Sequence, residues 1–264
     1  LHGDNRVMGL AVAEADTVFQ SAEILSIFLR KECRGNGHGK HLLETVEQRL
    51  VDLNITSLEG KFTRLGGEPH AIEKLLASCR WSAPKLRMRL FDLSTATILQ
   101  SKWVSNFTVL PESYEISPWS TVRPSEILEL RGQSWIPKDL HPEEHIYAGN
   151  DGAETLLPLC FVCRFNGDII GWHFTHKIDE TQVRFSVSYI HPEFQRDMLL
   201  IGLWYHAAVT TDRHGFERIR MGVNTTHAKM LEFCEQFMMP HATRVDDSMG
   251  VTKIIGKGAE DLWV

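Results

Sequence analysis

The chain has 264 residues, of which 43% are hydrophobic and 23% are charged, so it can bury the cores of one or two domains. Its net charge of −6 does not supply the basic surface that nucleic acid or an anionic membrane attracts. No apolar run reaches the roughly 18 residues that span a bilayer. We therefore expect neither nucleic acid nor a membrane as a partner.

The five cysteines are an odd number with irregular spacing, which argues against a disulfide framework and favours a reduced, cytoplasmic setting. Cys160 and Cys163 form a C-x-x-C pair inside an apolar, strand-like run. Residues i and i+3 of a strand point to opposite faces, so we expect no shared metal there. His173 and His176, near a strand end, are expected at the surface rather than on a metal.

The spacing of apolar residues predicts two successive series of elements. The first series has strands at 6–15, 21–29, 55–62 and 85–93, a helix beginning near residue 40 and a helix at 69–79. The second has strands at 114–117, 159–165, 168–175, 182–190, 218–223 and 250–255, and helices at 124–135, 198–213 and 227–237. The junction is predicted at about 94–110, with domains at 1–98 and 110–264.

A glycine-rich segment connects strand 21–29 to the helix that follows it. Its residues are Arg34, Gly35, Asn36, Gly37, His38, Gly39 and Lys40. Glycine permits positive φ and close backbone approach, and the N–H groups at a helix start favour a pyrophosphate. The spacing fits neither a Walker loop nor a dinucleotide fingerprint. A glycine-rich turn without a ligand is the alternative.

Arg34, Gly37 and Gly39 fit a third pattern, Arg-x-x-Gly-x-Gly, preceded by Leu29. This segment resembles the coenzyme A loop of the GNAT acetyltransferase superfamily. The order of elements over most of the chain resembles two GNAT domains in tandem, an α+β fold in which each mostly antiparallel, twisted sheet is flanked by helices. The first copy begins at what would be the family's second strand, which we interpret as lost N-terminal sequence of roughly 50 residues on the family pattern.

The resemblance implies that residues 34–40 bind the pyrophosphate of acetyl-CoA. It also implies that the edge of strand 21–29, through Ile27 and Leu29, pairs with the pantetheine arm. The second copy departs from the pattern because Met198 and Leu200 stand where Gly37 and Gly39 stand in the first. We therefore expect the second copy not to bind coenzyme A in the usual way, and to serve in packing, acceptor recognition or shaping the first site.

Transfer of an acetyl group to an amine benefits from a general base. Glu23, at the start of strand 21–29, resembles the base glutamate of the histone-type branch of the family, and apolar surroundings would raise its pKa. The alternative is a solvent-facing strand glutamate.

The family's usual acid is a tyrosine, and its slot holds Leu75 or Leu76 here, while Glu68 replaces the customary asparagine. Water or His70 would have to substitute for this acid.

We therefore expect an acyl-CoA-dependent acyltransferase that acetylates the amine of a small molecule, with acetyl-CoA as co-substrate and no metal. Acyl transfer to or from a carrier-protein thiol is one alternative, motivated by the missing tyrosine. A non-catalytic acyl-CoA-binding module is the other. The sequence does not specify an oligomeric state.

Overall fold

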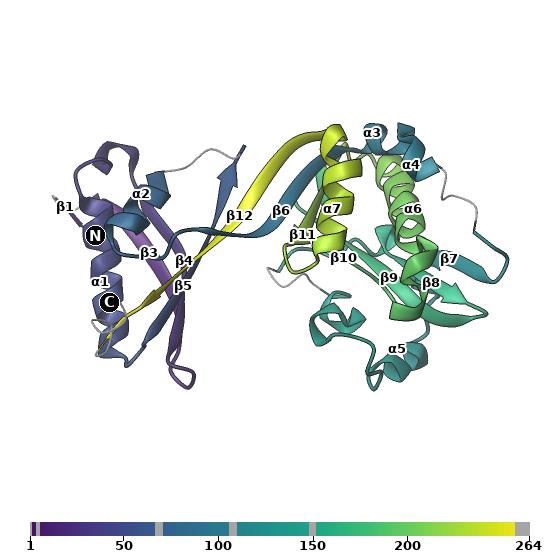
Figure 1. Cartoon of the computed structure of the whole chain (residues 1–264), viewed down its shortest axis with the longest axis horizontal. Helices are drawn as coiled ribbons and strands as arrows, with labels where there is room; N and C mark the ends of the chain where they lie inside the picture. Colours follow the sequence, from purple (N-terminus) through teal and green to yellow (C-terminus); the bar gives the residue numbers. More distant parts are fainter. Residues whose placement is uncertain (1, 4–5, 67–70, 106–109, 148–151, 257–264) are drawn as a thin grey trace. The chain divides into compact units, whose positions relative to one another are not determined.

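The computed structural model describes residues 2–3, 6–66, 71–105, 110–147 and 152–256, and the chain divides into two compact units (Figure 1). Unit 1 comprises Leu1–Arg89 and Asp246–Val264, and unit 2 comprises Leu90–Val245. The division falls inside β6 (Lys85–Ser94) and β12 (Ala242–Ile254). The end of the chain is therefore part of the unit that contains its beginning.

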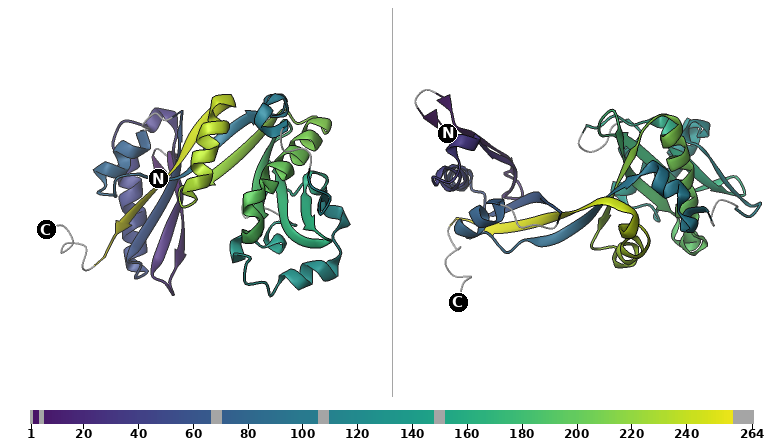
Figure 2. Two further views of the ribbon diagram at one scale, coloured as in Figure 1. Left: turned by 45° about the vertical axis from the view of Figure 1, so that its right-hand side comes forward. Right: turned by 90° about the horizontal axis from the view of Figure 1, so that it is seen from above.

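Unit 1 is a mixed sheet with strand order β3-β4-β5-β12-β6 and two helices on one face. Besides β6 and β12, unit 1 contains β1 (His2–Gly3), β2 (Arg6–Val7), β3 (Gly9–Asp16), β4 (Ser21–Leu29), α1 (His38–Asp52), β5 (Ser57–Leu65) and α2 (Ala71–Ser78). α1 packs along β3 and β4, as both views in Figure 2 show. Leu43 and Leu50 of α1 and Leu76 of α2 share one buried core with Ile24 of β4 and Leu58 of β5.

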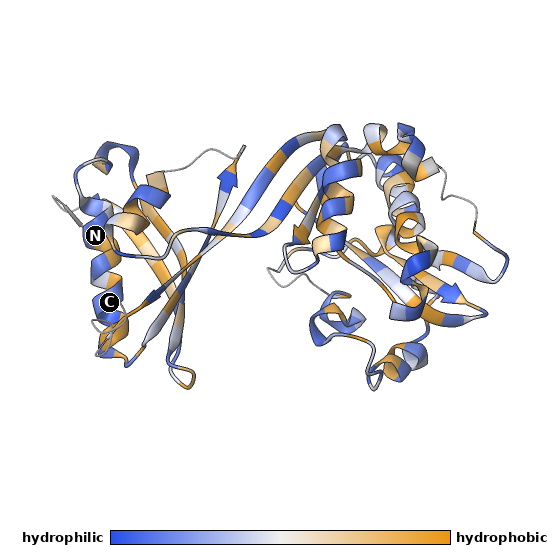
Figure 3. Ribbon diagram, viewed as in Figure 1, coloured by the Kyte–Doolittle hydropathy of each residue, from blue (hydrophilic) through white to orange (hydrophobic). Residues whose placement is uncertain are grey.

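The last strand of the chain, β12, completes the sheet of unit 1. It pairs antiparallel with β5, from Asp246↔Leu65 to Ile254↔Ser57. Hydrophilic and hydrophobic bands alternate along it (Figure 3), and the apolar side chains of Met249 and Val251 are buried. The sequence-based boundaries of 1–98 and 110–264 place this strand with the second copy. Its actual neighbours are β5 and β6, which both lie in the range predicted for the first copy, and local periodicity does not identify such distant pairing.

Unit 2 repeats the plan with strand order β6-β11-β10-β9-β8-β7. Its elements are α3 (Thr95–Gln100), α4 (Lys102–Ser105), β7 (Tyr114–Pro118), α5 (Pro124–Leu130), β8 (Phe161–Phe165), β9 (Asp168–Lys177), β10 (Gln182–Ile190), α6 (Leu199–Arg213), β11 (Arg218–Asn224) and α7 (Ala228–Phe237). The two successive strands predicted at 159–165 and 168–175 form an antiparallel hairpin, with Asn166 and Gly167 both at positive φ in its turn.

The sheet of unit 2 has a separate apolar cluster on each face. One contains Cys163 with the buried face of α6, and the other contains Cys160 with Trp172 and Leu130 of α5. The two thiols thus lie on opposite faces, as the strand period predicts. Burial raises the pKa of each to about 12. Among the described residues, no group of three potential metal-ligating side chains occurs.

Several sequence-based boundaries differ from the structure, and β12 begins at Ala242, well before the strand predicted at 250–255. The strand predicted at 6–15 is interrupted at Met8, between β2 and β3. The helix predicted at 124–135 ends at Leu130, followed at once by a turn that contains Gly132. The predicted junction at 94–110 includes two short helices, α3 and α4. Within the described part of the chain, no helix has the length and apolarity to cross a membrane.

Candidate active site

The two parallel strands β4 and β5 of unit 1 separate halfway along their length. Their pairing runs from Ser21↔Ser57 to Ile24↔Gly60 and stops there, although β4 continues to Leu29. On its other side β4 stays paired with β3, with a bulge at Leu25. A bulge bends and twists the strand that carries it, which helps β4 to diverge from β5. The second half of β4 thus has one edge that β5 does not cover.

The backbone of this edge is oriented for pairing with an extended ligand. The Arg30 N–H donates to the Met8 carbonyl, so the backbone polar groups of Arg30 point toward the β3 side. Amide directions alternate along a strand, so Ile27 and Leu29 direct their N–H and C=O groups away from β3. Part of this edge is used, because the Leu29 carbonyl accepts a hydrogen bond of 3.0 Å from Arg34 Nε.

The glycine-rich loop begins directly after this edge. Gly35 and Gly37 have φ of 84° and 80°, a left-handed conformation that favours glycine. A Cβ built on either would have no neighbouring atom within 4 Å, so open space lies beside both. Gly39 differs, because a Cβ there would lie 3.3 Å from Leu29 Cδ1 and 3.5 Å from Leu75 Cδ2. Two glycines therefore provide backbone conformation and the third provides close packing.

The loop ends at the N-terminus of α1. The His41 N–H donates to the Gly37 carbonyl at 3.1 Å, which starts the bonding of the helix. The amides of His38, Gly39 and Lys40 precede it and have no acceptor within the helix. No side chain caps this end at Gly37. Together with the helix dipole, these donors form a site suited to an anion.

Glu23 lies on the face of the sheet opposite the buried core, in a row of three carboxylates. Its register partners are Glu14 on β3 and Glu59 on β5. Lys61 Nζ lies 2.6 Å from Glu23 Oε2, and the Glu23 side chain is 31% exposed. Glu23 therefore does not have the apolar surroundings expected from the sequence. It lies in an ion pair with Lys61 and beside two other carboxylates. Sequence reasoning missed Lys61, because only the β4–β5 register brings it to Glu23.

The two leucines at the expected acid slot lie in different surroundings. Leu75 packs beside Gly39 of the loop, whereas Leu76 is buried in the core of unit 1. Neither carries a proton that it could donate. Glu68 and His70, the other residues considered for this role, lie outside the described residues.

Unit 2 reproduces the architecture of the site with different residues. β10 pairs in parallel with β11 only from Gln182↔Arg218 to Phe185↔Met221, and the bulged residue is Ser186. Met198 precedes α6 as Gly37 precedes α1, and it adopts a φ of 56° without being glycine. Its side chain and that of Leu200 pack against the core of unit 2. The two copies therefore share the divergence of the parallel strands and the left-handed residue before the helix, although the second copy lacks the glycines.

The histidine pair of β9 is not at the surface, contrary to the sequence-based expectation. His173 and His176 are both fully buried. His173 is hydrogen-bonded to the hydroxyls of Ser188 and Thr175, at 2.7 and 2.9 Å. Burial and the neighbouring His176 lower the pKa of His173 to about 3. These histidines therefore belong to a polar network within the sheet.

Comparisons with known proteins agree with this geometry. Residues 2–68, which contain β4, the loop and α1, match the model of the acetyltransferase (GNAT) family. A search of curated proteins finds no match to the sequence.

Solved structures share the fold over nearly the whole chain. A tandem GNAT protein from the clavulanic acid biosynthesis pathway is 11% identical, with a TM-score of 0.72 over 97% of this chain and 82% of its own. A GCN5-related N-acetyltransferase from Sphaerobacter thermophilus is 12% identical, with a TM-score of 0.66 over 97% of this chain and 79% of its own. The chain therefore has the fold of tandem GNAT proteins.

Proposed function

We propose that this chain is an acyl-CoA-dependent acyltransferase that moves an acetyl group from acetyl-CoA to the amine of a small molecule. The observation that supports this most directly is the continuity of the β4 edge with the glycine loop. A strand edge that can pair with pantetheine leads straight into a helix start that can hold pyrophosphate. The match of residues 2–68 to the GNAT family covers the same segment.

In this proposal the first copy holds acetyl-CoA mainly through its backbone. The amides of Gly37, His38, Gly39 and Lys40 receive the pyrophosphate, and the Arg34 and Lys40 side chains add positive charge. Gly35 and Asn36 shape the loop, and the open space beside Gly35 leaves room for the phosphates. Ile27 and Leu29 would hydrogen-bond the pantetheine arm.

Glu23 is the proposed general base of the reaction. An amine with a pKa near 10 is protonated at neutral pH, so it must lose a proton before it attacks the thioester. The carboxylates of Glu14, Glu23 and Glu59 outnumber Lys61, and this negative balance would attract a cationic amine. Lys61 would keep Glu23 oriented until the amine replaces it.

The absence of an acid at Leu75 favours a second candidate function. With leucine at this slot, the leaving thiolate must take its proton from water, from another side chain such as His70, or from the acceptor itself. A carrier-protein thiol as acceptor supplies such a proton. A non-catalytic acyl-CoA-binding module is the third possibility, and it requires no donor.

The test begins with calorimetric titration of acetyl-CoA into the wild-type chain and the Gly37→Glu variant, which places bulk and charge in the loop. Gly215→Glu is the matched control, because Gly215 also has positive φ, at 81°, and open space beside it. We expect one site that is lost only in Gly37→Glu. Equal binding by Gly37→Glu and the wild type would contradict the assignment of the loop.

Turnover is then measured as coenzyme A thiol release over panels of amines and a carrier-protein thiol. For an amine substrate, Glu23→Gln should lower kcat by about a hundredfold or more while the Kd for acetyl-CoA stays within twofold. Undiminished turnover in Glu23→Gln would remove this residue from the mechanism. Binding without release over both panels would favour the non-catalytic module.

A further inference from the structure

Strand β4 in unit 1 and strand β10 in unit 2 end at equivalent residues, Leu29 and Ile190. Each faces a glycine across the antiparallel pair, Gly9 for Leu29 and Gly171 for Ile190. A Cβ on either glycine would overlap the side chain of its partner. The two strand ends are therefore packed against the neighbouring strand in the same way, although the two sequences differ.

The chain then makes the same turn in both copies. In unit 1 the Cys33 N–H donates to the Arg30 carbonyl at 2.9 Å. In unit 2 the Phe194 N–H donates to the His191 carbonyl, also at 2.9 Å. The helix begins at the ninth residue after the strand in each copy. The path from strand to helix thus has the same length and the same first turn.

A side-chain hydrogen bond connects this turn to the strand end in both copies. Arg34 Nε donates to the Leu29 carbonyl at 3.0 Å. Gln195 Nε2 donates to the Ile190 carbonyl at 3.1 Å. Each donor lies five residues after its acceptor, and each acceptor carbonyl lies on the edge that the diverging parallel strand leaves uncovered. The side chain thus supplies the hydrogen bond that a strand carbonyl ordinarily receives from its neighbour.

The two residues share a hydrogen-bond donor but not a charge. Arg34 is cationic, and its guanidinium carbon also lies 5.8 Å from the centre of the Phe28 ring. Gln195 is neutral, and its copy has Met198 where the first copy has Gly37. A charge directed at a phosphate therefore does not explain the donor in unit 2. The hydrogen bond to the strand end is the feature that both copies have.

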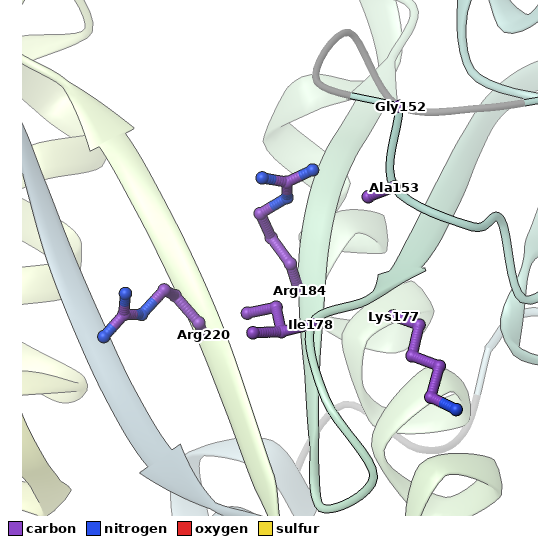
Figure 4. Close-up of a pocket in the computed structure, with 6 residues that line it drawn as sticks. All are labelled: Gly152, Ala153, Lys177, Ile178, Arg184 and Arg220. Atoms are coloured by element: carbon purple, nitrogen blue, oxygen red, sulfur yellow. The ribbon is translucent and has the colours of Figure 1, made fainter. Parts of the chain in front are cut away.

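Pockets within unit 2 do not explain Gln195 either. Arg184, the third residue of β10 as Glu23 is of β4, lines a pocket of about 380 Å³ (Figure 4). A second pocket, of about 390 Å³, includes Thr95. Among the described residues that line these two pockets, Gln195 does not occur. Its hydrogen bond is explained by the turn itself.

We propose that Arg34 is a positioning residue for the glycine loop. Its Nε holds the turn against the end of β4, and this fixes the start of the segment whose amides, from Gly37 to Lys40, face the ligand. Without the bond, only part of the molecules would have the loop in the binding conformation, and the apparent affinity falls by that fraction. The effect on acetyl-CoA rests on the proposed function, whereas the anchoring of the turn does not.

The first experiment measures amide hydrogen exchange in the ligand-free full chain, with the Cys33 amide as the reporter of the turn. Arg34→Met removes the donor and keeps an unbranched side chain, and Arg34→Gln restores a donor without the charge. Exchange at Cys33 should be about fivefold faster in Arg34→Met and should return to within about twofold of the wild type in Arg34→Gln. Exchange at the buried Leu43 should stay unchanged, which separates local opening from unfolding.

Unit 2 provides the same comparison without any role for acetyl-CoA. Gln195→Met should accelerate exchange of the Phe194 amide about fivefold, and Gln195→Arg, which keeps a donor, should not. Arg49→Met is the matched control, because Arg49 is exposed in the last turn of α1, at the end away from the loop. It should leave exchange at both reporters within twofold. Unchanged exchange at Cys33 in Arg34→Met, or no recovery in Arg34→Gln, would overturn the proposal.

Calorimetric titration of acetyl-CoA then tests the consequence for binding. It is carried out at about 1 M salt, where the Debye length is about 3 Å and the charge of an exposed arginine contributes little. Arg34→Met should raise the Kd about fivefold, and Arg34→Gln should recover most of this loss. Equal weakening in the two variants would contradict the positioning role. If the wild type does not bind, the proposed function fails, and the exchange measurements still decide whether Arg34 anchors the turn.

Discussion

Lys253, near the end of β12, should contribute strongly to the folding stability of unit 1, although it is almost the last described residue. Its Nζ donates to Glu47 Oε2 of α1 at 2.6 Å and to the Cys79 carbonyl at 2.7 Å. The other oxygen of Glu47 accepts from Trp81 Nε1 at 2.7 Å. Glu47 is only 7% exposed, so Lys253→Met would leave a buried carboxylate without its cation.

The expected cost follows from the burial of the pair. Removing one partner of a buried ion pair costs about 3–5 kcal/mol, and the lower end applies because the Lys253 side chain is still 17% exposed. For a unit of roughly 100 residues, each kcal/mol lowers Tm by about 4 °C or more, so a loss of about 3 kcal/mol predicts a decrease of roughly 12 °C. Thermal and urea unfolding, followed by tryptophan fluorescence and circular dichroism, measure this change.

A double variant separates the pair from simple loss of packing. Glu47→Gln keeps an acceptor for Trp81 and removes the charge, so Glu47→Gln combined with Lys253→Met should recover more than half of the lost stability. The reasoning would be refuted by a Lys253→Met variant within about 0.5 kcal/mol of the wild type, a change typical of surface substitutions. A coupling energy near zero in the cycle would refute it equally.

Three further outcomes are expected. Gly39→Val should weaken acetyl-CoA binding more than tenfold in calorimetry, because its added methyl groups would collide with Leu29 and displace the loop. A hydrogen bond from Arg164, opposed by burial, lowers the pKa of Glu126 from 4.5 to about 2. The stability that this carboxylate contributes is therefore present above pH 4.5 and lost as the pH falls toward 2. In acid unfolding curves, Arg164→Gln should flatten this pH dependence. The pKa of His173 is lowered from 6.5 to about 3, so the unfolded chain binds the extra proton first, and unfolding free energies measured by urea should decrease as the pH falls from 6.5 toward 3. A flat profile over that interval would show that His173 is accessible to solvent.

The elements around the glycine loop could be predicted because their causes are local. Positive φ at Gly35 and Gly37 and the helical spacing of the leucines after them are set by neighbouring residues, and the structure has both features. The β8–β9 hairpin follows from its Asn166–Gly167 turn, and the opposite faces of Cys160 and Cys163 follow from the strand period. The roles of Glu23 and the loop in binding and catalysis stay predictions.

The tertiary structure decided whatever depends on which strands pair and in which register. That β12 pairs with β5, that Lys61 contacts Glu23, and that His173 is buried in a polar network are consequences of long-range pairing. That Glu23 and Arg184 occupy equivalent positions in the two copies emerges only when the two registers are compared. Periodicity determines which face of a strand is buried, but the choice of neighbour depends on the packing of the whole unit, and the groups that two strands bring together depend on that choice.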